Sequence, residues 1–556
     1  MEKIVMGNKT KQIIILIFLA YIFLMFGNGL LSLTNPDEVF YTQTAREMIQ
    51  HKTWMTPILF GQPQFEKPIF IYWLIRVSFS IFGNTSFAAR FGPAFIAILG
   101  IIATYLLALL GFKDNKKAFF VSFILMSSGL YIGLARTVFT DMIFSVFILF
   151  ALLAFYWGYT CKARKGLGLI LFFVSSALAV LSKGPLGILI PFSIILVFLF
   201  IKKDLKFVIS KYSLLGLIAF AAIALPWYIL MEVKYGSVFN REFFYNDHFV
   251  RIIRAEHRDN DTWYFYPLTA LGAVFPWTIY TCIALVCLFI NIGRRMKDFN
   301  LFLLLWVSSV FLTFQFAHSK LTSYVFPFFP ALAIMTGDYI YDQVLAKKQS
   351  RVFFVASIIM AVVLFIFPIA IPIAGISILK DYPIFIEPGP LVYFSFSLLI
   401  LMAVLFLVFI LRRKFMKAFY LLSLPVLVLI FSAGFMHEKI EPYVSSRDAA
   451  NYLMNNYKVE GPIICSKFYA RGVRFYTDKE VVAVDIPGSQ FFSPHPILFL
   501  DTHQKVRDFL SKRPINYGIL KKNNVRDFEG LTEKHYKFEV LKQCGNEYVV
   551  RISPLP

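Results

Sequence analysis

The chain has 556 residues, of which 58% are hydrophobic and 18% aromatic, and its formal net charge is +22. A mean hydropathy of +0.67 excludes an ordinary soluble globular protein and is typical of a polytopic membrane protein. The basic charge does not indicate nucleic-acid binding, because of where it lies. Residues 1–436 contain 37 Lys and Arg against 19 Asp and Glu, and most of this excess sits in short loops between apolar segments.

Residues 12–32 form the first apolar segment. A retained membrane anchor is favoured over a cleaved signal peptide, because the segment is long and no small-residue cleavage site stands out near its end. Later segments are each close to the ~20 residues that cross the hydrocarbon core. They are 89–111, 118–135, 138–157, 166–182, 184–201, 212–232, 264–291, 299–317, 323–344, 352–375, 391–411 and 417–436. We therefore predict a polytopic α-helical membrane protein with about 13 transmembrane helices.

Every second connecting loop is strongly basic. These loops contain Lys113, Lys116 and Lys117; Lys162, Arg164 and Lys165; Lys202, Lys203, Lys206 and Lys211; Arg294, Arg295 and Lys297; Lys347, Lys348 and Arg351; and Arg412, Arg413, Lys414 and Lys417. The positive-inside rule places all of them in the cytoplasm with the N-terminus. An odd number of spans then places the C-terminal region outside, so we expect a multi-pass membrane protein with a cytoplasmic N-terminus and an extracytoplasmic C-terminal domain.

Residues 437–556 predict a small α/β domain after the membrane domain of residues 1–436. Helices are expected at 445–457 and 503–513, and strands at 461–468, 471–478, 480–486, 515–522, 535–542 and 547–552. The domain has no nucleotide-binding glycine motif and no obvious catalytic cluster, so it is an extracytoplasmic lid, a docking domain or a structural cap. Cys465 and Cys544 either pair in an oxidising compartment or remain free thiols.

Polar chemistry concentrates in the first outer loop, residues 35–88, whose interleaved prolines and aromatics predict short helices on the membrane surface. Asp37 and Glu38 open this loop, although acids also favour helix starts without any catalytic role. Glu66 and Lys67 are adjacent charges beside proline and aromatic residues, an arrangement that is costly at a membrane surface unless both are partnered.

Four separated outer loops present cations on one side of the membrane, and several acids share that side. The cations are Lys67, Lys183, Arg251 and Lys320, and the acids are Asp37, Glu66 and Asp141. A ring of cations there suits a phosphate or pyrophosphate headgroup, although Lys183 alone would equally snorkel to the interface. The acids suit a general base or a metal ion. Because no ATP motif occurs, the energy must lie in the substrate, and a lipid-phosphate-linked donor meets that requirement.

Many motifs, in order over the first 330 residues, resemble the aminoarabinose transferase family. They are PDE at 36–38, AREM at 45–48, FEKP at 65–68, YWL at 72–74, AAR at 88–90, AR at 135–136, SKGP at 182–185, PWY at 226–228, DHFVR at 247–251, FPW at 275–277 and SKLTSYVFP at 319–327. Members of this family are GT-C-type glycosyltransferases that use polyprenyl-phosphate sugars and modify lipid A.

The resemblance implies an inverting sugar transfer from undecaprenyl phosphate at the periplasmic face of a bacterial inner (plasma) membrane, with the C-terminal domain in the periplasm. The expected sugar is 4-amino-4-deoxy-L-arabinose, the expected acceptor is lipid A or another envelope molecule, and the expected consequence is polymyxin resistance. Phosphate ligands are implied at Lys67, Arg251 and Tyr324, to which the charge pattern adds Lys183 and Lys320. Acidic and metal-site positions are implied at Asp37, Glu66, Asp141 and His248. We therefore expect catalytic residues at Asp37, Glu38 and Asp141, and a divalent metal ion at Glu66 and His248. No nucleotide cofactor is expected.

Other functions remain open at this point. A protein O-glycosyltransferase, similar to the mannosyltransferases, would use the same class of donor on a different acceptor. A lipid flippase or transporter would place its polar residues near mid-span in broken helices, whereas the charges of this chain cluster in outer loops. A membrane scaffold would leave the multi-loop charge cluster unexplained.

Overall fold

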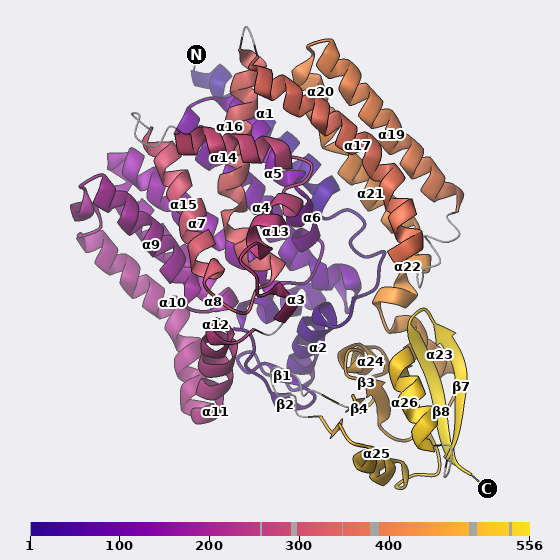
Figure 1. Ribbon diagram of the computed structural model, residues 1–556. Helices are drawn as coiled ribbons and strands as arrows, with labels where there is room; N and C mark the ends of the chain where they lie inside the picture. Colours follow the sequence, from indigo (N-terminus) through magenta and orange to yellow (C-terminus); the bar gives the residue numbers. More distant parts are fainter. Residues whose placement is uncertain are drawn as a thin grey trace.

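The structure is a computed structural model that describes residues 2–255, 258–290, 297–346, 349–378, 389–486, 488, 497–532 and 536–555. A bundle of long helices makes up most of the molecule, and a smaller domain with a sheet follows it (Figure 1). The N-terminus lies at one end of the bundle, and the C-terminal domain lies beyond the opposite end (Figure 1).

The helices of the bundle are apolar along most of their length, as a lipid environment requires. Their bounds are α1 Glu2–Leu24, α4 Ser86–Phe112, α5 Asn115–Met126, α6 Gly129–Ala135, α7 Thr140–Thr160, α8 Lys165–Lys183, α9 Leu186–Ile201, α10 Lys211–Tyr235, α13 Phe265–Ala273, α14 Thr278–Ile290, α15 Asp298–Gln315, α16 Phe329–Leu345, α17 Arg351–Ile378, α19 Pro390–Leu411, α20 Phe415–Leu422 and α21 Leu424–Phe435.

Within the described residues, 8 helices are long and apolar enough to cross a membrane, or 9 if the bent pair α5 and α6 forms one span. The other predicted spans coincide with α1, α9, the α13–α14 pair, and the 3-10 helix η5 (Thr322–Phe328) with α16. The helical membrane fold is thus confirmed, while the count of thirteen spans stays a prediction. The 67° bend between α5 and α6 falls at Ser127 and Ser128, whose hydroxyls donate to carbonyls of the preceding turn and compete with helix continuation.

The predicted basic loops gather at one end of the bundle. Lys117 lies 2.5 Å from both Asp338 and Asp342, which joins the first turn of α5 to the C-terminal half of α16. Further contacts connect the other basic loops and the helix ends beside them. They are Phe112 with Phe299, Lys202 with Asp298, Lys165 with Phe207, and Arg413 with Phe354. Arg294, Arg295, Lys347 and Lys348, and most of the predicted outer loop 376–390, lie outside the described residues. The basic loops, which alternate with other loops along the sequence, therefore lie at the same end of the molecule.

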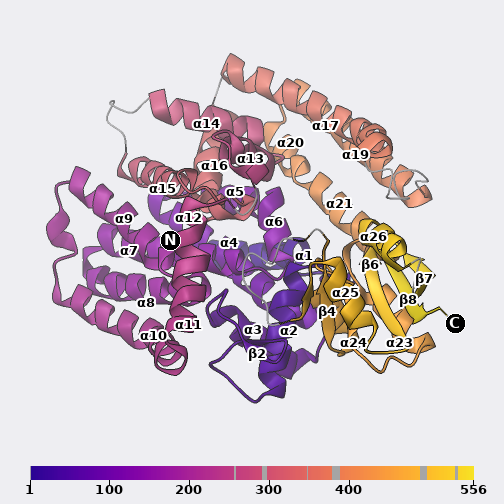
Figure 2. The ribbon, with the colours of Figure 1, turned by 60° about the horizontal axis from the view of Figure 1, so that its bottom comes forward.

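The first outer loop forms the short helices that its sequence predicts and, between them, a small hairpin that it did not predict. They are α2 (Asp37–Gln50), the hairpin strands β1 (Ile58–Leu59) and β2 (Gln62–Pro63), and α3 (Phe70–Phe82). Helix α2 is largely buried, because the bundle covers one of its faces and helix α24 of the C-terminal domain another; Figure 2 shows α2 and α24 side by side.

The C-terminal domain is an α/β structure with a six-stranded sheet in the order β5-β4-β3-β6-β8-β7. Its elements are α22 His437–Val444, α23 Arg447–Asn456, β3 Ile463–Ser466, α24 Ala470–Thr477, β4 Val481–Val484, β5 Phe499–Leu500, α25 His503–Leu510, β6 Asn516–Lys521, α26 Lys522–Thr532, β7 Tyr536–Cys544 and β8 Glu547–Pro554. Strands β3, β4, β5 and β6 run parallel, and β7 and β8 add an antiparallel pair. Helices α23 and α24 cover one face, and α25 and α26 the other.

Two predictions for this domain are decided by the structure. The predicted strand 471–478 is wrong, because the segment forms helix α24, which makes the crossover that two parallel strands such as β3 and β4 require. Cys465 and Cys544 are both free thiols, so the disulfide alternative is not realised.

Candidate active site

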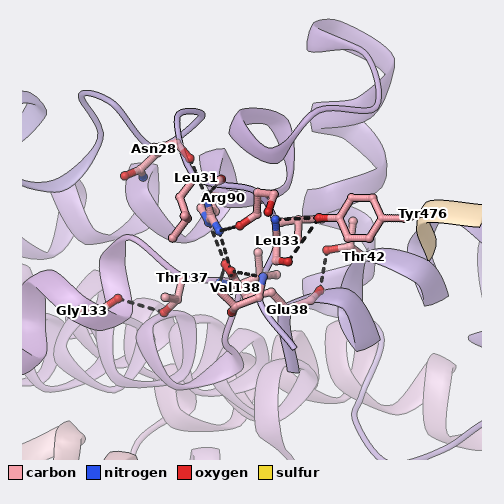
Figure 3. A network of polar contacts seen from close by, with 12 residues as sticks. Asn28, Leu31, Leu33, Glu38, Thr42, Arg90, Gly133, Thr137, Val138 and Tyr476 are labelled. Atoms are coloured by element: carbon pink, nitrogen blue, oxygen red, sulfur yellow. Dashed lines mark hydrogen bonds and ion pairs between the residues drawn. The ribbon is translucent and has the colours of Figure 1, made fainter. Parts of the chain in front are cut away.

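A buried ion pair between Glu38 and Arg90 holds the start of the first outer loop in place (Figure 3). The Arg90 guanidinium donates to both carboxylate oxygens at 2.8 and 2.6 Å, and also to the carbonyls of Asn28, Leu31 and Ser32. Glu38 in turn accepts from the backbone N–H of Val138 at 3.0 Å. Burial opposes ionisation of Glu38, but the Arg90 charge and its hydrogen bonds outweigh burial and lower the pKa of the carboxyl.

Glu38 therefore faces protein groups with both of its oxygens. It joins the segment before α2 to the connection that leads into α7, and these two places carry Asp37 and Asp141. Its geometry is that of a residue that positions the two neighbouring acids. A catalytic role for Glu38 stays a prediction.

Lys67, Asp247, Arg251 and Tyr324 form a continuous chain of polar contacts. Lys67 Nζ lies 2.7 Å from one oxygen of Asp247, and Arg251 lies 3.0 Å from the other. Arg251 also donates to the Tyr324 hydroxyl at 2.8 Å. Asp247 belongs to the π-helix η3 (Asn240–Val250), and the salt bridge reaches one turn on to α12 (Arg251–Ile253). Three distant segments thus bring together the predicted phosphate ligands Lys67, Arg251 and Tyr324.

Asp247 is a buried acid between two cations. Burial alone would raise the pKa of its carboxyl, but the charges of Lys67 and Arg251 outweigh burial and lower it. Asp247 is therefore ionised near neutral pH and holds two positive side chains close to each other. It was not among the predicted site residues, although its position beside His248 in DHFVR was a signal.

Lys183 and Asp141 contact each other at the ends of α8 and α7. The Lys183 ammonium also lies 4.5 Å from the centre of the Tyr324 ring, so the structure joins this pair to the phosphate-ligand chain. Gly184 follows with φ of +104°, and a Cβ there would come within 2.4 Å of His248 Nε2. The SKGP turn therefore needs glycine, because the imidazole of the facing loop packs directly on its backbone.

The residues predicted to hold a metal ion contact other protein groups, and a metal ion at this place stays a prediction. His248 Nδ1 lies 2.7 Å from the carbonyl of Phe243, and burial lowers the pKa of its imidazole. Glu66 lies 3.7 Å from the guanidinium of Arg471. In the described part of the chain, no group of three His, Cys, Asp or Glu side chains has the spacing of a metal site. No step is therefore derived through a metal.

Lys320 is the one predicted phosphate ligand that the structure pairs elsewhere. It lies 2.9 Å from Asp261, which also accepts from His318 at 2.7 Å. These two partners lower the pKa of the Asp261 carboxyl. The turn that contains Lys320 still contacts the phosphate-ligand chain, because the Ser319 backbone N–H donates to the carbonyl of Arg251 at 3.0 Å. Lys320 lies next to the phosphate-ligand chain and holds the loop that carries Tyr324.

Asp37 is exposed at the start of α2, one turn before the buried Tyr41. Burial raises the pKa of Tyr41, and the negative charges of Asp141 and Asp37 raise it further. Both acids therefore act on the same phenol from two different elements. The sequence did not single out Tyr41, although its spacing of four residues from Asp37 places both on one helix face.

The C-terminal domain contributes charged residues that the sequence analysis missed. Arg471 and Arg474 of α24 approach Glu66 and Glu47 of the first loop at 3.7 and 3.6 Å. Tyr476 exchanges hydrogen bonds with the backbone of Leu33, beside the Glu38 network (Figure 3). The spacing of Arg471, Arg474 and Phe475 was a helical signal, but the segment was predicted as a strand.

The cation cluster can therefore bind an anionic group, and exposed Asp37 and the Lys183-paired Asp141 lie around it. Residues 10–238 match the family of dolichyl-phosphate-mannose-protein mannosyltransferases. An undecaprenyl phosphate-alpha-4-amino-4-deoxy-L-arabinose arabinosyl transferase of Serratia proteamaculans is 28% identical over 67% of this chain and 66% of its own length. A second arabinosyl transferase of that name, from Proteus mirabilis, is 30% identical over 60% of each chain.

These matches span less than two thirds of either relative. Likeness of fold extends further. The crystal structure of ArnT from Cupriavidus metallidurans bound to undecaprenyl phosphate superimposes with a TM-score of 0.79 over 98% of both chains, at 20% identity. The sequence matches in the N-terminal part make this chain similar to the aminoarabinose transferases, and along its whole length it shares the fold of the ArnT structure.

Proposed function

We propose that this protein transfers a sugar from undecaprenyl phosphate to an envelope acceptor at the outer face of the bacterial inner membrane. The observation that carries the proposal is the convergence of Lys67, Arg251 and Tyr324, with Lys183 beside them, at the end of the bundle away from the basic loops. Cations so placed suit the phosphate of a lipid-linked donor. The names of the relatives support 4-amino-4-deoxy-L-arabinose as the sugar and undecaprenyl phosphate as its carrier.

In the proposed reaction, an acceptor oxygen attacks the anomeric carbon of the sugar from the face opposite the phosphate. A new carbon–oxygen bond forms as the bond to the phosphate oxygen breaks, so the configuration inverts. The bonding electrons pass to the phosphate, and Lys67, Arg251 and Tyr324 stabilise that charge, because preorganised donors strengthen as charge develops. A hydroxyl acceptor would give its proton to Asp37 or Asp141, whereas the phosphate of lipid A is already ionised and needs no base.

The test is a single-turnover assay with purified protein, the aminoarabinose donor lipid and lipid A in nanodiscs, with products followed by mass spectrometry. Wild-type protein should transfer the sugar with inversion. Asp37→Asn should lower turnover about 100-fold or more with a hydroxyl acceptor and less with a phosphate acceptor, because general bases contribute 10²–10⁴-fold. Normal turnover of Asp37→Asn together with an inactive Asp141→Asn or Glu66→Gln variant would move the catalytic acid to one of those positions.

A protein O-mannosyltransferase is the second candidate, and the match of residues 10–238 to the mannosyltransferase family favours it. The same assay with a polyprenyl-phosphate mannose donor and a serine- or threonine-rich peptide separates the two. Sugar on the peptide and none on lipid A would select the second candidate. The predicted metal requirement is tested in the same reaction by EDTA; a loss of transfer that Mn²⁺ or Mg²⁺ restores would establish it.

A further inference from the structure

The sheet of the C-terminal domain has an edge at which parallel strands end beside the first outer loop. Strand β3 lies between β4 and β6, so the chain winds from β3 to one side and later returns to the other. Helices cover both faces of this sheet. Open sheets of this kind bind ligands at the carboxyl ends of their strands, where the winding reverses. Here that place lies between the ends of β3 and β6.

The residues at this place are mostly cationic. Lys467 follows β3, and Lys521 is the last residue of β6. The hydroxyl of Ser466 accepts from the Lys521 backbone N–H at 2.8 Å, so the two strand ends are tied together. Phe468 is 41% exposed beside them, and the Lys521 ammonium lies 4.2 Å from the centre of its ring. A basic rim with an exposed aromatic side chain results.

Burial disfavours the charged forms of both lysines. Burial lowers the pKa of Lys467, although Asp485 at the end of β4 opposes this effect. Burial lowers the pKa of Lys521 as well, again against Asp485. The charge of Arg471 lowers the pKa of Lys467 further. An anion bound between the two lysines would stabilise both charged forms.

This edge is continuous with the donor site. Arg471 lies one turn beyond Lys467, at the start of α24, and its guanidinium is 3.7 Å from the Glu66 carboxylate. The carbonyl of Glu66 accepts from Lys67, a phosphate ligand of the proposed donor site. Phe60 of the β1–β2 hairpin packs against the core of the C-terminal domain, which closes the first loop onto the domain (Figure 2). An acceptor held at this edge would lie next to the sugar of the donor.

We propose that Lys467, Arg471 and Lys521 form a binding site for the anionic group of the acceptor, a phosphate monoester on a membrane glycolipid. This inference rests on the proposed function and adds to it a role for the C-terminal domain. The domain is then a substrate-binding part of the enzyme.

The test compares two double variants of equal charge in nanodiscs. Lys467→Gln with Lys521→Gln removes the cations at the carboxyl ends of β3 and β6. Lys458→Gln with Lys512→Gln removes two lysines that precede the same strands. We expect the first pair to raise KM for the phosphorylated acceptor about tenfold or more, since hydrogen bonds from two charged groups to the phosphate are lost. Donor affinity, and kcat at saturating acceptor, should stay close to wild type, as should all values for the control pair.

A dephosphorylated acceptor should remove the difference between the first pair and wild type. An unchanged KM of that pair for the phosphorylated acceptor would overturn the inference. Direct binding of the phosphorylated glycolipid to the same nanodiscs is measured in parallel. If wild-type protein transfers no sugar, the proposed function fails, and the binding assay still decides the inference: weaker binding by the first pair alone supports it, and equal binding overturns it.

Discussion

At the residue scale, Asp247 has the clearest role in the donor-free protein. Its side chain is 7% exposed and contacts Lys67 and Arg251, each 15% exposed. The carboxylate keeps two cations together that would otherwise repel each other in a poorly hydrated place. A donor phosphate would meet the same two side chains. Asp247 is therefore both a preorganising residue and a competitor of the phosphate.

This role predicts a distinctive phenotype for Asp247→Asn. Loss of the counter-charge should lower the thermal stability of the donor-free protein, because removal of one partner of a buried pair costs on the order of 3–5 kcal/mol. Added undecaprenyl phosphate should then raise the melting temperature of the variant more than that of wild type. Asp259→Asn, an exposed acid of the same loop, is the control. A smaller ligand-induced shift in Asp247→Asn than in wild type would contradict the role.

Lys67 and Arg251 are predicted to bind the donor phosphate directly. Lys67→Ala or Arg251→Ala should weaken binding of undecaprenyl phosphate by roughly tenfold or more, because a hydrogen bond to a charged group contributes about 1.5–3 kcal/mol. Fluorescence or calorimetric titration in detergent measures the affinity. Arg254→Ala, an exposed arginine three residues further on, should bind as wild type does. Unchanged affinity in both test variants would remove these residues from the site.

At the scale of elements, the sequence predicted helices and strands best where a segment has one clear hydrophobic pattern. Apolar runs located the helices of the bundle, and short segments rich in β-branched and aromatic residues located β3, β4, β6, β7 and β8. Loop charges and motifs located Lys67, Lys183, Arg251 and Tyr324, which the fold brings together. Helix α24 was mistaken for a strand, because its eight residues mix aromatic, β-branched and charged side chains that suit both structures.

The partners of the site residues were not predictable in the same way. Arg90 and Glu38 are 52 positions apart, and Arg471 and Glu66 come from different domains, so only the tertiary fold joins them. A single sequence shows that a charge is present, but it does not show which opposite charge meets it. The neighbours Glu38 and Asp37 illustrate this. The oxygens of Glu38 face Arg90 and backbone donors, whereas Asp37 is exposed, and the sequence alone does not tell the two acids apart.

Strand β8 begins with a carboxyl group that makes the contact between domains sensitive to pH. Glu547 accepts from the Ser446 hydroxyl at 2.6 Å and lies 3.4 Å from the Asn35 amide. Burial raises the pKa of Glu547 from its ordinary 4.5 to about 8, although the Ser446 hydrogen bond opposes this. Because the folded pKa is above the unfolded one, the stabilisation is complete below pH 4.5 and is lost as the pH rises through about 8.

We therefore expect the contact between the C-terminal domain and the first loop to weaken progressively as the pH rises from 4.5 to about 8, the window between the unfolded and the folded pKa, and to change little at higher pH. Limited proteolysis and thermal unfolding over this range measure the effect. Glu547→Gln should flatten the pH dependence, because the neutral amide imitates the protonated acid. Glu539→Gln, at a surface ion pair with Arg551, should leave it unchanged. An equally steep pH dependence in Glu547→Gln would assign the effect to another group.

At the scale of the whole molecule, charge separates the two ends of the bundle. The end with the basic loops carries simple pairs such as Lys202 with Asp298 and Lys117 with Asp338. The other end carries the buried, mixed-charge site and the C-terminal domain (Figure 1). Positive loop charge is retained in the cytoplasm, whereas the mixed charges of the other end have no such bias. The basic loops that alternate along the sequence thus lie together at one end of the bundle.

This arrangement predicts the topology of the chain in the membrane. Reporter fusions after Lys165 and after Lys203 should be active in the cytoplasm, and fusions after Gly83 and after Pro556 should be active outside, because the contacts of the basic loops place the first two at one end. Paired alkaline phosphatase and green fluorescent protein fusions report the two sides with opposite signals. A cytoplasmic signal after Pro556 would place the C-terminal domain and the cation cluster inside. The donor would then have to be presented at the cytoplasmic face, and the proposed acceptor, together with the inferred role of Lys467 and Lys521, would have to be sought there.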